Sequence, residues 1–275
     1  METFVNKVAV VTGAGSGIGQ ALSIELAKLG CQLALSDINA EGLTATVDQI
    51  NAITRETNVH TQVLDVSKQE DVTDYAQVVF AEFGAVDLLF NNAGVALSAM
   101  LDDVSRDDFN WLMNINFWGV VNGCEAFLPH MKQSPNAHII NISSIFGMVS
   151  VPGQGTYNAA KFAVRGYTEC LRQEMALTCP SVMVSAVHPG GISTQIARNA
   201  RIPEGEDPEE LAKQFDEVAH TTPEKAAQII LAGVKKNKAR IMVGWDAHIV
   251  HFVCRLLGAR YMKLTQWLFK RKKQN

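Results

Sequence analysis

Short apolar runs alternate with helical stretches along most of the chain. The apolar runs are continuous, as expected for strands that are covered on both faces of a sheet. The predicted strands are Lys7–Thr12, Gln32–Asp37, Val59–Leu64, Val86–Asn91, Ala137–Ile142, Met183–Val187 and Ala239–Val243. The predicted helices are Gly17–Leu29, Glu41–Arg55, Lys68–Phe83, Arg106–Lys132, Thr156–Thr178 and Pro223–Lys236. Strands that alternate with helices build parallel sheets through right-handed crossovers.

This order predicts an α/β fold with a single doubly wound domain, a parallel seven-stranded sheet with helices on both faces. We expect that domain to span residues 1–245, and residues 246–275 to form a C-terminal helix packed on the domain or at an interface. The least regular stretch, Ser193–Thr222, is rich in Pro, Glu and Gly. We expect it to run over the edge of the sheet, as a lid would.

The composition is that of a folded protein rather than a disordered chain. Hydrophobic residues make up 47% and charged residues 19% of the sequence, and the net charge of −4 argues against a general nucleic-acid binder. The five cysteines lack C-x-x-C spacing, so reduced core cysteines are expected, and no residue set has metal-ligand spacing. With no secretory signal and no long uncharged apolar stretch, a cytoplasmic location is expected.

The first predicted strand ends in a glycine-rich turn, Thr12-Gly13-Ala14-Gly15-Ser16-Gly17-Ile18-Gly19. Glycine permits a tight turn and lets backbone N–H groups at a helix N-terminus approach a pyrophosphate. A plain strand-to-helix turn would also use glycines, but an acid about 20 residues later is typical of dinucleotide-binding Rossmann domains. The residues expected to bind the dinucleotide here are Gly13, Gly15, Ser16, Gly17, Ile18 and Gly19.

Asp37 is that acid, at the end of the second predicted strand. Its carboxylate would accept hydrogen bonds from the adenosine ribose hydroxyls and repel a 2′-phosphate. Neither Ser16 nor Ile38 supplies a cation that would bind such a phosphate. The sequence therefore favours NAD over NADP as cofactor.

Further motifs follow in order along the chain. They include Asn91-Asn92-Ala93-Gly94, and Ser144 followed by Tyr157 and Lys161 in the spacing S…Y-x-x-x-K. Together with the T-G-x-x-x-G-x-G turn, they resemble the short-chain dehydrogenase/reductase family from about Asn6 to Val243. The additional cofactor-binding residues that this resemblance implies are Asp65, Val66, Asn92, Ala93, Gly94, Tyr157, Lys161, Pro189, Gly190, Ile192 and Thr194.

Tyr157 and Lys161 share one face of a predicted helix because they are four residues apart. A free tyrosine, with a pKa near ~10, is a poor base at neutral pH. A positive charge ~4 Å away is worth about 4 kcal/mol at an effective dielectric constant near ~20, or roughly three pKa units. Lys161 and the oxidised nicotinamide ring can therefore bring Tyr157 towards its working range as the acid/base of an alcohol oxidation or a carbonyl reduction.

The resemblance implies roles for the other members of the predicted catalytic set, Asn116, Ser144, Tyr157 and Lys161. Ser144 would bind the substrate oxygen, Asn116 would hold a water beside Lys161, and Lys161 would also bind the nicotinamide ribose. Ser143 and Asn114 are alternatives that the spacing disfavours. His188 is a possible acid/base residue, although polar residues at strand ends commonly cap turns.

The predicted substrate-binding residues are Ser144, Phe146, Met148, Val151 and Tyr157. Three segments are expected to wall the pocket: Val95–Met100, Phe146–Gly155 and Gly191–Arg201. The apolar side chains of the middle segment, which also include Val149, favour a hydrophobic secondary alcohol or ketone, although core packing would explain each of them singly.

The C-terminal segment differs in charge from the rest of the chain. Residues 254–275 carry seven Lys or Arg and no acid, so residues 1–253 hold the other 17 basic residues against all 28 acidic ones, a charge of −11. Apolar residues recur near helical spacing at Ile249, Phe252, Val253, Leu256, Leu257, Leu264, Trp267 and Leu268. An amphipathic helix with a basic end, Lys270–Lys273, would bind an anionic membrane, or it would pack over the pocket or a partner subunit.

The leading hypothesis is an oxidoreductase that transfers hydride between NAD(H) and a hydrophobic secondary alcohol or ketone. An NADPH-dependent carbonyl reductase is the alternative within the family. A nucleotide-sensing protein without turnover, and a protein that mainly binds membranes, are alternatives from other classes. The resemblance also implies a homodimer or homotetramer.

Overall fold

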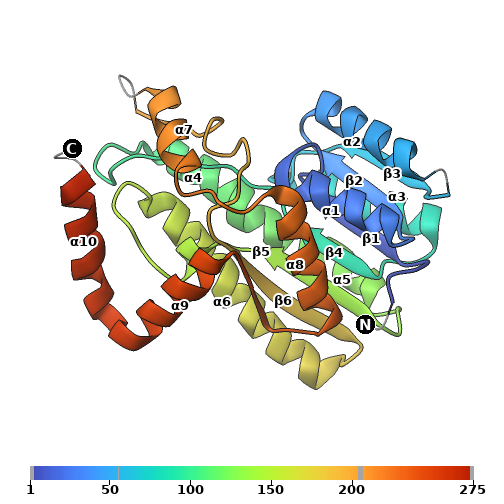
Figure 1. Cartoon of the computed structure of the whole chain (residues 1–275). Coiled ribbons are helices and arrows are strands. Elements are labelled where there is room, and N and C mark those ends of the chain that lie inside the picture. The colour runs from blue at the N-terminus through green and yellow to red at the C-terminus, as the bar shows by residue number, and fades with distance from the viewer. Residues whose placement is uncertain (1–2, 55, 204–206, 273–275) are drawn as a thin grey trace.

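The computed structural model describes residues 3–54, 56–203 and 207–272. Its strands form one parallel seven-stranded sheet in the order β3-β2-β1-β4-β5-β6-β7, which confirms the predicted doubly wound fold (Figure 1). The strands are β1 (Val8–Thr12), β2 (Gln32–Asp37), β3 (Val59–Val63), β4 (Leu88–Asn91), β5 (Ala137–Ile142), β6 (Val182–Pro189) and β7 (Arg240–Val243).

The helices that follow these strands match most of the predicted ones within a few residues. Arg55, which the sequence analysis includes in the second helix, lies outside the described residues. The main helices are α1 (Gly17–Lys28), α2 (Ala40–Ile53), α3 (Gln69–Phe83), α4 (Arg106–Met113), α5 (Gly119–Met131), α6 (Gly155–Thr178), α7 (Pro208–Asp216), α8 (Pro223–Lys235), α9 (Trp245–Leu257) and α10 (Tyr261–Lys272).

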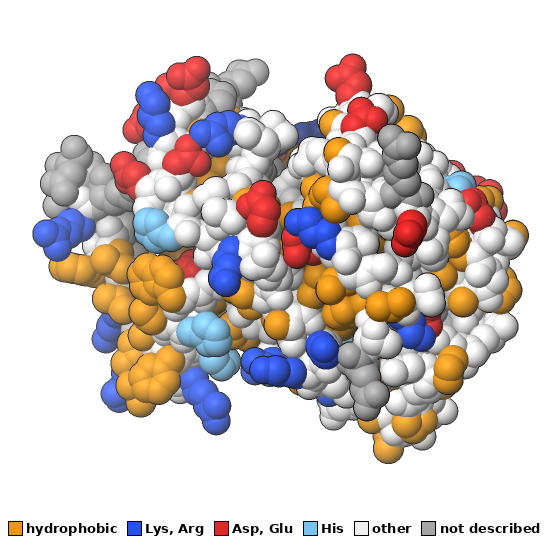
Figure 2. Space-filling view, turned by 45° about the vertical axis from the view of Figure 1, so that its right-hand side comes forward, with side chains coloured by type: hydrophobic (Ala, Val, Ile, Leu, Met, Phe, Trp, Pro, Cys, Tyr) orange, Lys and Arg blue, Asp and Glu red, His pale blue; other side chains and the backbone are white. Residues whose placement is uncertain are grey.

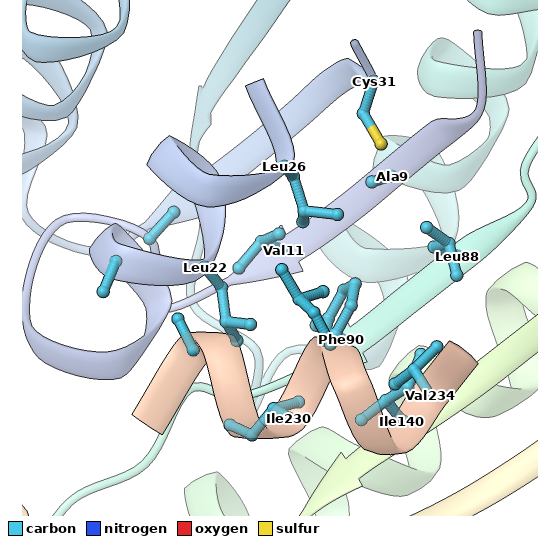
Figure 3. Packing of buried hydrophobic residues seen from close by; sticks show 14 of the residues in the cluster. Ala9, Val11, Leu22, Leu26, Cys31, Leu88, Phe90, Ile140, Ile230 and Val234 are labelled. Atoms are coloured by element: carbon cyan, nitrogen blue, oxygen red, sulfur yellow. The ribbon is translucent and has the colours of Figure 1, made fainter. Parts of the chain in front are cut away.

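Both faces of the sheet are covered because neighbouring residues of a strand point to opposite sides. Ala9 and Val11 of β1 belong to the cluster that contains the buried residues of α1 and α8, whereas Val10 packs with residues of α3, α5 and α6. Figure 3 shows the first cluster, in which Leu22 of α1 and Ile230 of α8 meet over the sheet. This double cover explains why the strands are continuously apolar.

The predicted helix Arg106–Lys132 is divided in the structure. A π-helical turn, η1 (Asn114–Trp118), separates α4 from α5. The residues that flank this turn, Met113 and Gly119, keep right-handed helical backbone angles, so the apolar periodicity gives no sign of the turn. A π turn inserts one residue into the helix and changes which side chains face inward. Here it buries Asn116 completely, while Asn114 remains exposed.

The C-terminal segment forms two helices where the sequence predicts one. α9 and α10 are separated by a 3-10 turn, η3 (Gly258–Arg260). Gly258 has a φ of 52°, which a helix cannot accommodate. Figure 1 shows α9 running away from the sheet and α10 turning back along the edge of the molecule. Lys273, the last residue of the expected basic end, lies outside the described residues.

The described part of the irregular stretch Ser193–Thr222 contains one helix, α7, and is joined to the rest of the domain by two β-bridges. Leu97 forms a β-bridge with Arg201, and Ile192 forms one with Thr221. Arg201 also bonds to Asp108 of α4, at 2.7 Å. No helix among the described residues is long and apolar enough to cross a bilayer.

Candidate active site

The glycine-rich turn lies at the carboxyl ends of β1 and β4, where the strand order reverses direction, the usual place for a ligand in such sheets. Gly13 has a φ of 66°, and a Cβ there would lie 2.8 Å from the Ala93 Cα atom. A Cβ at Gly19 would collide with the Gly13 carbonyl. Glycines are required here because helix α1, β1 and the end of β4 approach one another so closely.

Thr12 and Asn92 fasten the turn to β4. The backbone N–H groups of Asn92 and Ala93 both donate to Thr12 Oγ1, at 3.0 and 3.1 Å. In return, Asn92 Nδ2 donates to the carbonyls of Thr12 and Gly13. Asn92 and Ala93, both predicted to bind the cofactor, therefore hold the turn against the end of β4.

Asp37, the residue predicted to bind the adenosine ribose, lies beside the glycine-rich turn. Its Oδ2 accepts a hydrogen bond of 2.8 Å from the Gly15 N–H, and its Oδ1 accepts one from the Asn39 N–H. Ser16 is exposed at the start of α1, whose first turn contains no acid. The free N–H groups of this helix end therefore lie next to one carboxylate, in the arrangement that suits a pyrophosphate followed by a ribose.

The remaining cofactor-side motifs line the same edge of the sheet. Asp65 accepts hydrogen bonds from the backbone and hydroxyl of Ser67, and Val66 packs against Gly119, where a Cβ would lie 2.7 Å from its side chain. A Cβ at Gly94 would lie 3.1 Å from Asn116 Oδ1 and 3.6 Å from Lys161 Nζ. The strand end after β4 thus reaches the predicted catalytic residues.

Ser144, Tyr157 and Lys161 come together, from the end of β5 and the first turns of α6. Tyr157 and Ser144 share a side-chain hydrogen bond, which acts to lower the tyrosine pKa, but burial outweighs it and raises that pKa to about 12. Lys161 Nζ lies 5.5 Å from the centre of the Tyr157 ring and donates to the Ile142 carbonyl at 3.1 Å. Burial lowers the pKa of Lys161 to about 8.

Asn116 lies next to Lys161 and is held by the backbone of Val95. Its Oδ1 accepts from the Val95 N–H and its Nδ2 donates to the Val95 carbonyl, both at 2.8 Å. This pair of bonds links the π turn to the loop after β4. The completely buried amide is therefore fixed in one orientation beside the lysine.

Ser143 and His188, the alternative candidates for catalytic roles, both bond to backbone carbonyls. Ser143 donates to the Lys161 carbonyl at 2.8 Å, so its hydroxyl joins β5 to α6. His188 is fully buried, and its Nδ1 lies 3.0 Å from the Ser144 carbonyl oxygen. Burial lowers its pKa to about 4, so the imidazole is neutral at pH 7. Its contact is with the backbone of Ser144.

The Pro189-Gly190 segment, predicted to bind the cofactor, is held by Asp246. Gly191 donates a 2.7 Å hydrogen bond to Asp246, and a Cβ at Gly190 would collide with the same carboxylate. Ile192 is buried, and a Cβ at Gly17 would lie 3.1 Å from the Thr194 side chain. The Thr194 side chain therefore lies directly against the N-terminus of α1.

The predicted substrate-binding residues separate into two groups. The Phe146 ring meets the Tyr157 ring edge-on, with centres 6.2 Å apart, and Val151 lines a cavity of about 320 Å³. The other lining residues are Met100, Leu101, Asp102, Pro152, Gly153 and Gly155. Met148, in contrast, is buried and is absent from the lining, and Val149 packs against α9.

Sequence reasoning missed three residues that hold the site. Thr12 organises the glycine-rich turn, and Asp246 holds the backbone of the Pro189-Gly190 segment. Asn158 donates to the carbonyls of Phe146 and Val149, and it accepts from the Val151 N–H. Asn158 follows Tyr157 directly, a weak signal, whereas nothing near Asp246 in the sequence indicates its contact.

Comparison with known proteins agrees with this geometry. The family model described as short chain dehydrogenase matches residues 7–205. The chain is 48% identical to an oxidoreductase named SadH from Mycobacterium tuberculosis over 266 residues, 96% of both chains. It also resembles a short-chain dehydrogenase/reductase from Burkholderia phymatum, solved in complex with NAD, with a TM-score of 0.86 and 31% identity over 95% of this chain and 97% of that one.

An alcohol dehydrogenase from Thermococcus sibiricus, complexed with 5-hydroxy-NADP, is similar at a TM-score of 0.72 and 26% identity, over 86% of this chain and 95% of that one. The fold and the motif order thus define a nucleotide-binding oxidoreductase. The chain belongs to the short-chain dehydrogenase/reductase family, as its motifs predicted.

Proposed function

We propose that this enzyme transfers hydride between NAD(H) and a hydrophobic secondary alcohol or ketone, with Tyr157 as the acid/base. The observation that carries the proposal is the meeting of Ser144, Tyr157 and Lys161 beside the strand end that follows β4. The Ser144 hydroxyl would orient the substrate, the Tyr157 phenol would exchange a proton with it, and the Lys161 ammonium would supply a positive charge.

The residues on the cofactor side fit a nicotinamide dinucleotide. The α1 N-terminus begins at glycines that a Cβ would block, and the Thr194 side chain lies directly against it. Asp37 favours NAD because its carboxylate would accept from two ribose hydroxyls but would repel a 2′-phosphate. When bound, the dinucleotide supplies the nicotinamide ring that accepts or returns hydride.

Tyr157 moves the proton of the reaction. Its raised pKa keeps the free phenol protonated at neutral pH, ready to donate to a ketone oxygen. In the oxidation direction the phenol must first lose that proton. The Lys161 ammonium favours this loss, because a nearby positive charge stabilises a phenolate, and with a pKa of about 8 the lysine is still mostly charged at pH 7.

Ser144 and Asn116 complete the set. The Ser144 hydroxyl, which bonds to Tyr157, would hold the substrate oxygen within reach of the phenol. The Asn116 amide would hold a water beside Lys161 and so connect the lysine with solvent. Both are proposed roles.

The substrate class follows from the walls beside Tyr157. The Phe146 ring lies against the tyrosine. A cavity that includes Gly155, two residues before Tyr157 in the chain, is lined mainly by Met100, Leu101, Val151 and Pro152. Apolar walls of this kind favour ligands with a hydrophobic body. We further propose that residues 1–245 act as the catalytic domain and that the enzyme is a cytoplasmic homodimer or homotetramer.

Calorimetric titration of NAD and NADP into the wild type and an Asp37→Ala variant tests the cofactor assignment. The wild type is expected to bind NAD at least about tenfold more tightly, a difference of ~1.4 kcal/mol, and the variant to lose that preference. NADP binding as tight as NAD binding would refute the assignment. A panel of alcohols with NAD tests the substrate class, which fails if short polar polyols are oxidised better than bulky apolar secondary alcohols.

A further inference from the structure

We infer that α9 and α10 form a surface that docks on an anionic lipid bilayer and delivers bilayer-dissolved alcohols to the adjacent cavity. The delivery step rests on the proposed function, whereas the docking step stands on the surface alone. This C-terminal surface is defined by the exposed side chains of residues 249–271. Figure 2 shows hydrophobic and basic side chains side by side at its left edge, where these helices lie.

Apolar exposure is concentrated on this surface. Of the twenty large hydrophobic side chains that are exposed among the described residues, seven lie between Ile249 and Leu268. Phe252 is 65% exposed and Leu256 is 72% exposed. Other large apolar members are Ile249, Leu264, Trp267 and Leu268. A contiguous apolar patch of this kind marks a surface that another phase or partner covers.

The charges of the same helices indicate which partner. Residues 247–271 contain five Lys or Arg and no acid, in a chain whose net charge is −4. The five are Arg255, Arg260, Lys263, Lys270 and Arg271, all of them exposed. The guanidinium of Arg271 lies 5.5 Å from the centre of the Trp267 ring. Basic side chains among exposed Trp, Phe and Leu are the pattern of helices that lie in the headgroup region of anionic membranes.

A second copy of the chain fits this surface less well. A two-fold contact presents the same patch from both sides, so the cationic side chains of one copy would face those of the other without a single acid from residues 247–271. Anionic headgroups instead neutralise these charges while the apolar side chains enter the acyl region. Charge complementarity therefore favours the bilayer.

The surface is joined to the substrate side of the site. Tyr261, at the start of α10, accepts a 3.1 Å hydrogen bond from the Ser150 N–H. The next residue, Val151, lines the cavity, and Phe146 of the same loop belongs to one cluster with Val250, Cys254 and Tyr261. An alcohol dissolved in the bilayer would therefore reach the cavity along this loop.

Vesicle sedimentation with the full-length enzyme tests the docking. The probes are phosphatidylcholine vesicles with and without phosphatidylglycerol, at low and high salt. The charge variant is R260Q/K263Q/K270Q, and the apolar variant is F252S/L256S/L268S. The matched control, L177S/K235Q/K236Q, removes one exposed apolar and two exposed basic side chains from another face.

We expect the wild type to bind the anionic vesicles at least about tenfold more tightly than the neutral ones, and to be released by salt. Both surface variants should bind at least about tenfold more weakly, and the control should bind like the wild type. Absence of wild-type binding, equal binding to both vesicles, or equal loss in the control would overturn the inference. If vesicles are not bound and the apolar variant forms a smaller species in analytical ultracentrifugation, the surface belongs to a second copy.

Kinetics test the delivery step separately. Anionic vesicles should lower the KM of the wild type for a long-chain secondary alcohol, but not for a short water-soluble one. The charge variant should lose this effect and keep its kcat on the soluble alcohol. Vesicle binding without any NAD-dependent turnover would refute the proposed function and leave the docking inference standing. NAD-dependent turnover without vesicle binding would refute the docking inference and leave the proposed function standing. Vesicle binding with an unchanged KM would overturn the delivery step.

Discussion

Helices α1 and α9 differ by one residue in length and both carry large apolar side chains. The apolar side chains of α1 are buried, whereas those of α9 are largely exposed. Six residues of α1 are buried, between the sheet and α8, and Leu22 and Leu26 are completely covered. In α9, all of whose residues the structure describes, Ala247 alone is buried. Apolar periodicity thus indicates that a helix has a face to cover, but does not indicate what covers it.

The largest predicted effect on this contrast is on kcat, in the candidate active site of the buried region. Y157F removes the proton donor but keeps the ring and its contact with Phe146, so we expect kcat to fall about 10³-fold with NAD affinity unchanged. Steady-state kinetics and calorimetry measure the two. Y261F, which removes a hydroxyl from the C-terminal surface, is the control and should leave kcat nearly unchanged. A parallel loss of NAD affinity in Y157F would contradict the acid/base role.

The next prediction compares the free energy of unfolding of two variants, one with a leucine changed in α1 and one with a leucine changed in α9. L22A leaves a cavity in the core and should lower the free energy of unfolding by about 2–5 kcal/mol. L256A removes an exposed side chain and should change it by less than about 0.5 kcal/mol. Urea unfolding of both variants checks this. A large cost for L256A would mean that the surface is covered in solution.

Acid should weaken the buried region first. Burial lowers the pKa of His188 to about 4 and that of His138 to about 3, from 6.5 in the unfolded chain. The unfolded state therefore binds more protons below pH 6.5, so stability is complete above that pH and is lost as the pH falls towards 4. For His188 alone the loss is on the order of 3 kcal/mol. Unfolding at pH 7 and pH 4.5 measures it, and H188N should flatten the dependence; an unchanged slope would contradict the assignment.

The smallest effect concerns the turn between α9 and α10. G258A places a Cβ on a backbone with a φ of 52° and should cost about 1 kcal/mol locally. Because α10 contributes little buried surface, the melting temperature should hardly change, while hydrogen exchange in residues 259–272 should become faster. A clear fall in melting temperature would show that α10 supports the domain.

Much of the candidate site could be predicted because its residues follow one another at short, local spacings. Tyr157 and Lys161 share a helix face by simple periodicity, and the glycines after β1 are required wherever a helix begins so close to two strands. The contacts of Asn158 and Asp246 could not be predicted, because each depends on which loops meet after folding. The π turn at Asn116 was hidden as well, since it leaves the helical apolar pattern almost intact.

By itself the sequence determined the doubly wound sheet and the family, and it named the residues of the candidate site, because strand and helix periodicity and short motifs are local properties of the chain. The tertiary structure alone decided that the C-terminal segment breaks at Gly258 into two helices with an uncovered apolar and basic face. Periodicity gives a helix its two faces, but whether a face is buried depends on the space left by every other element.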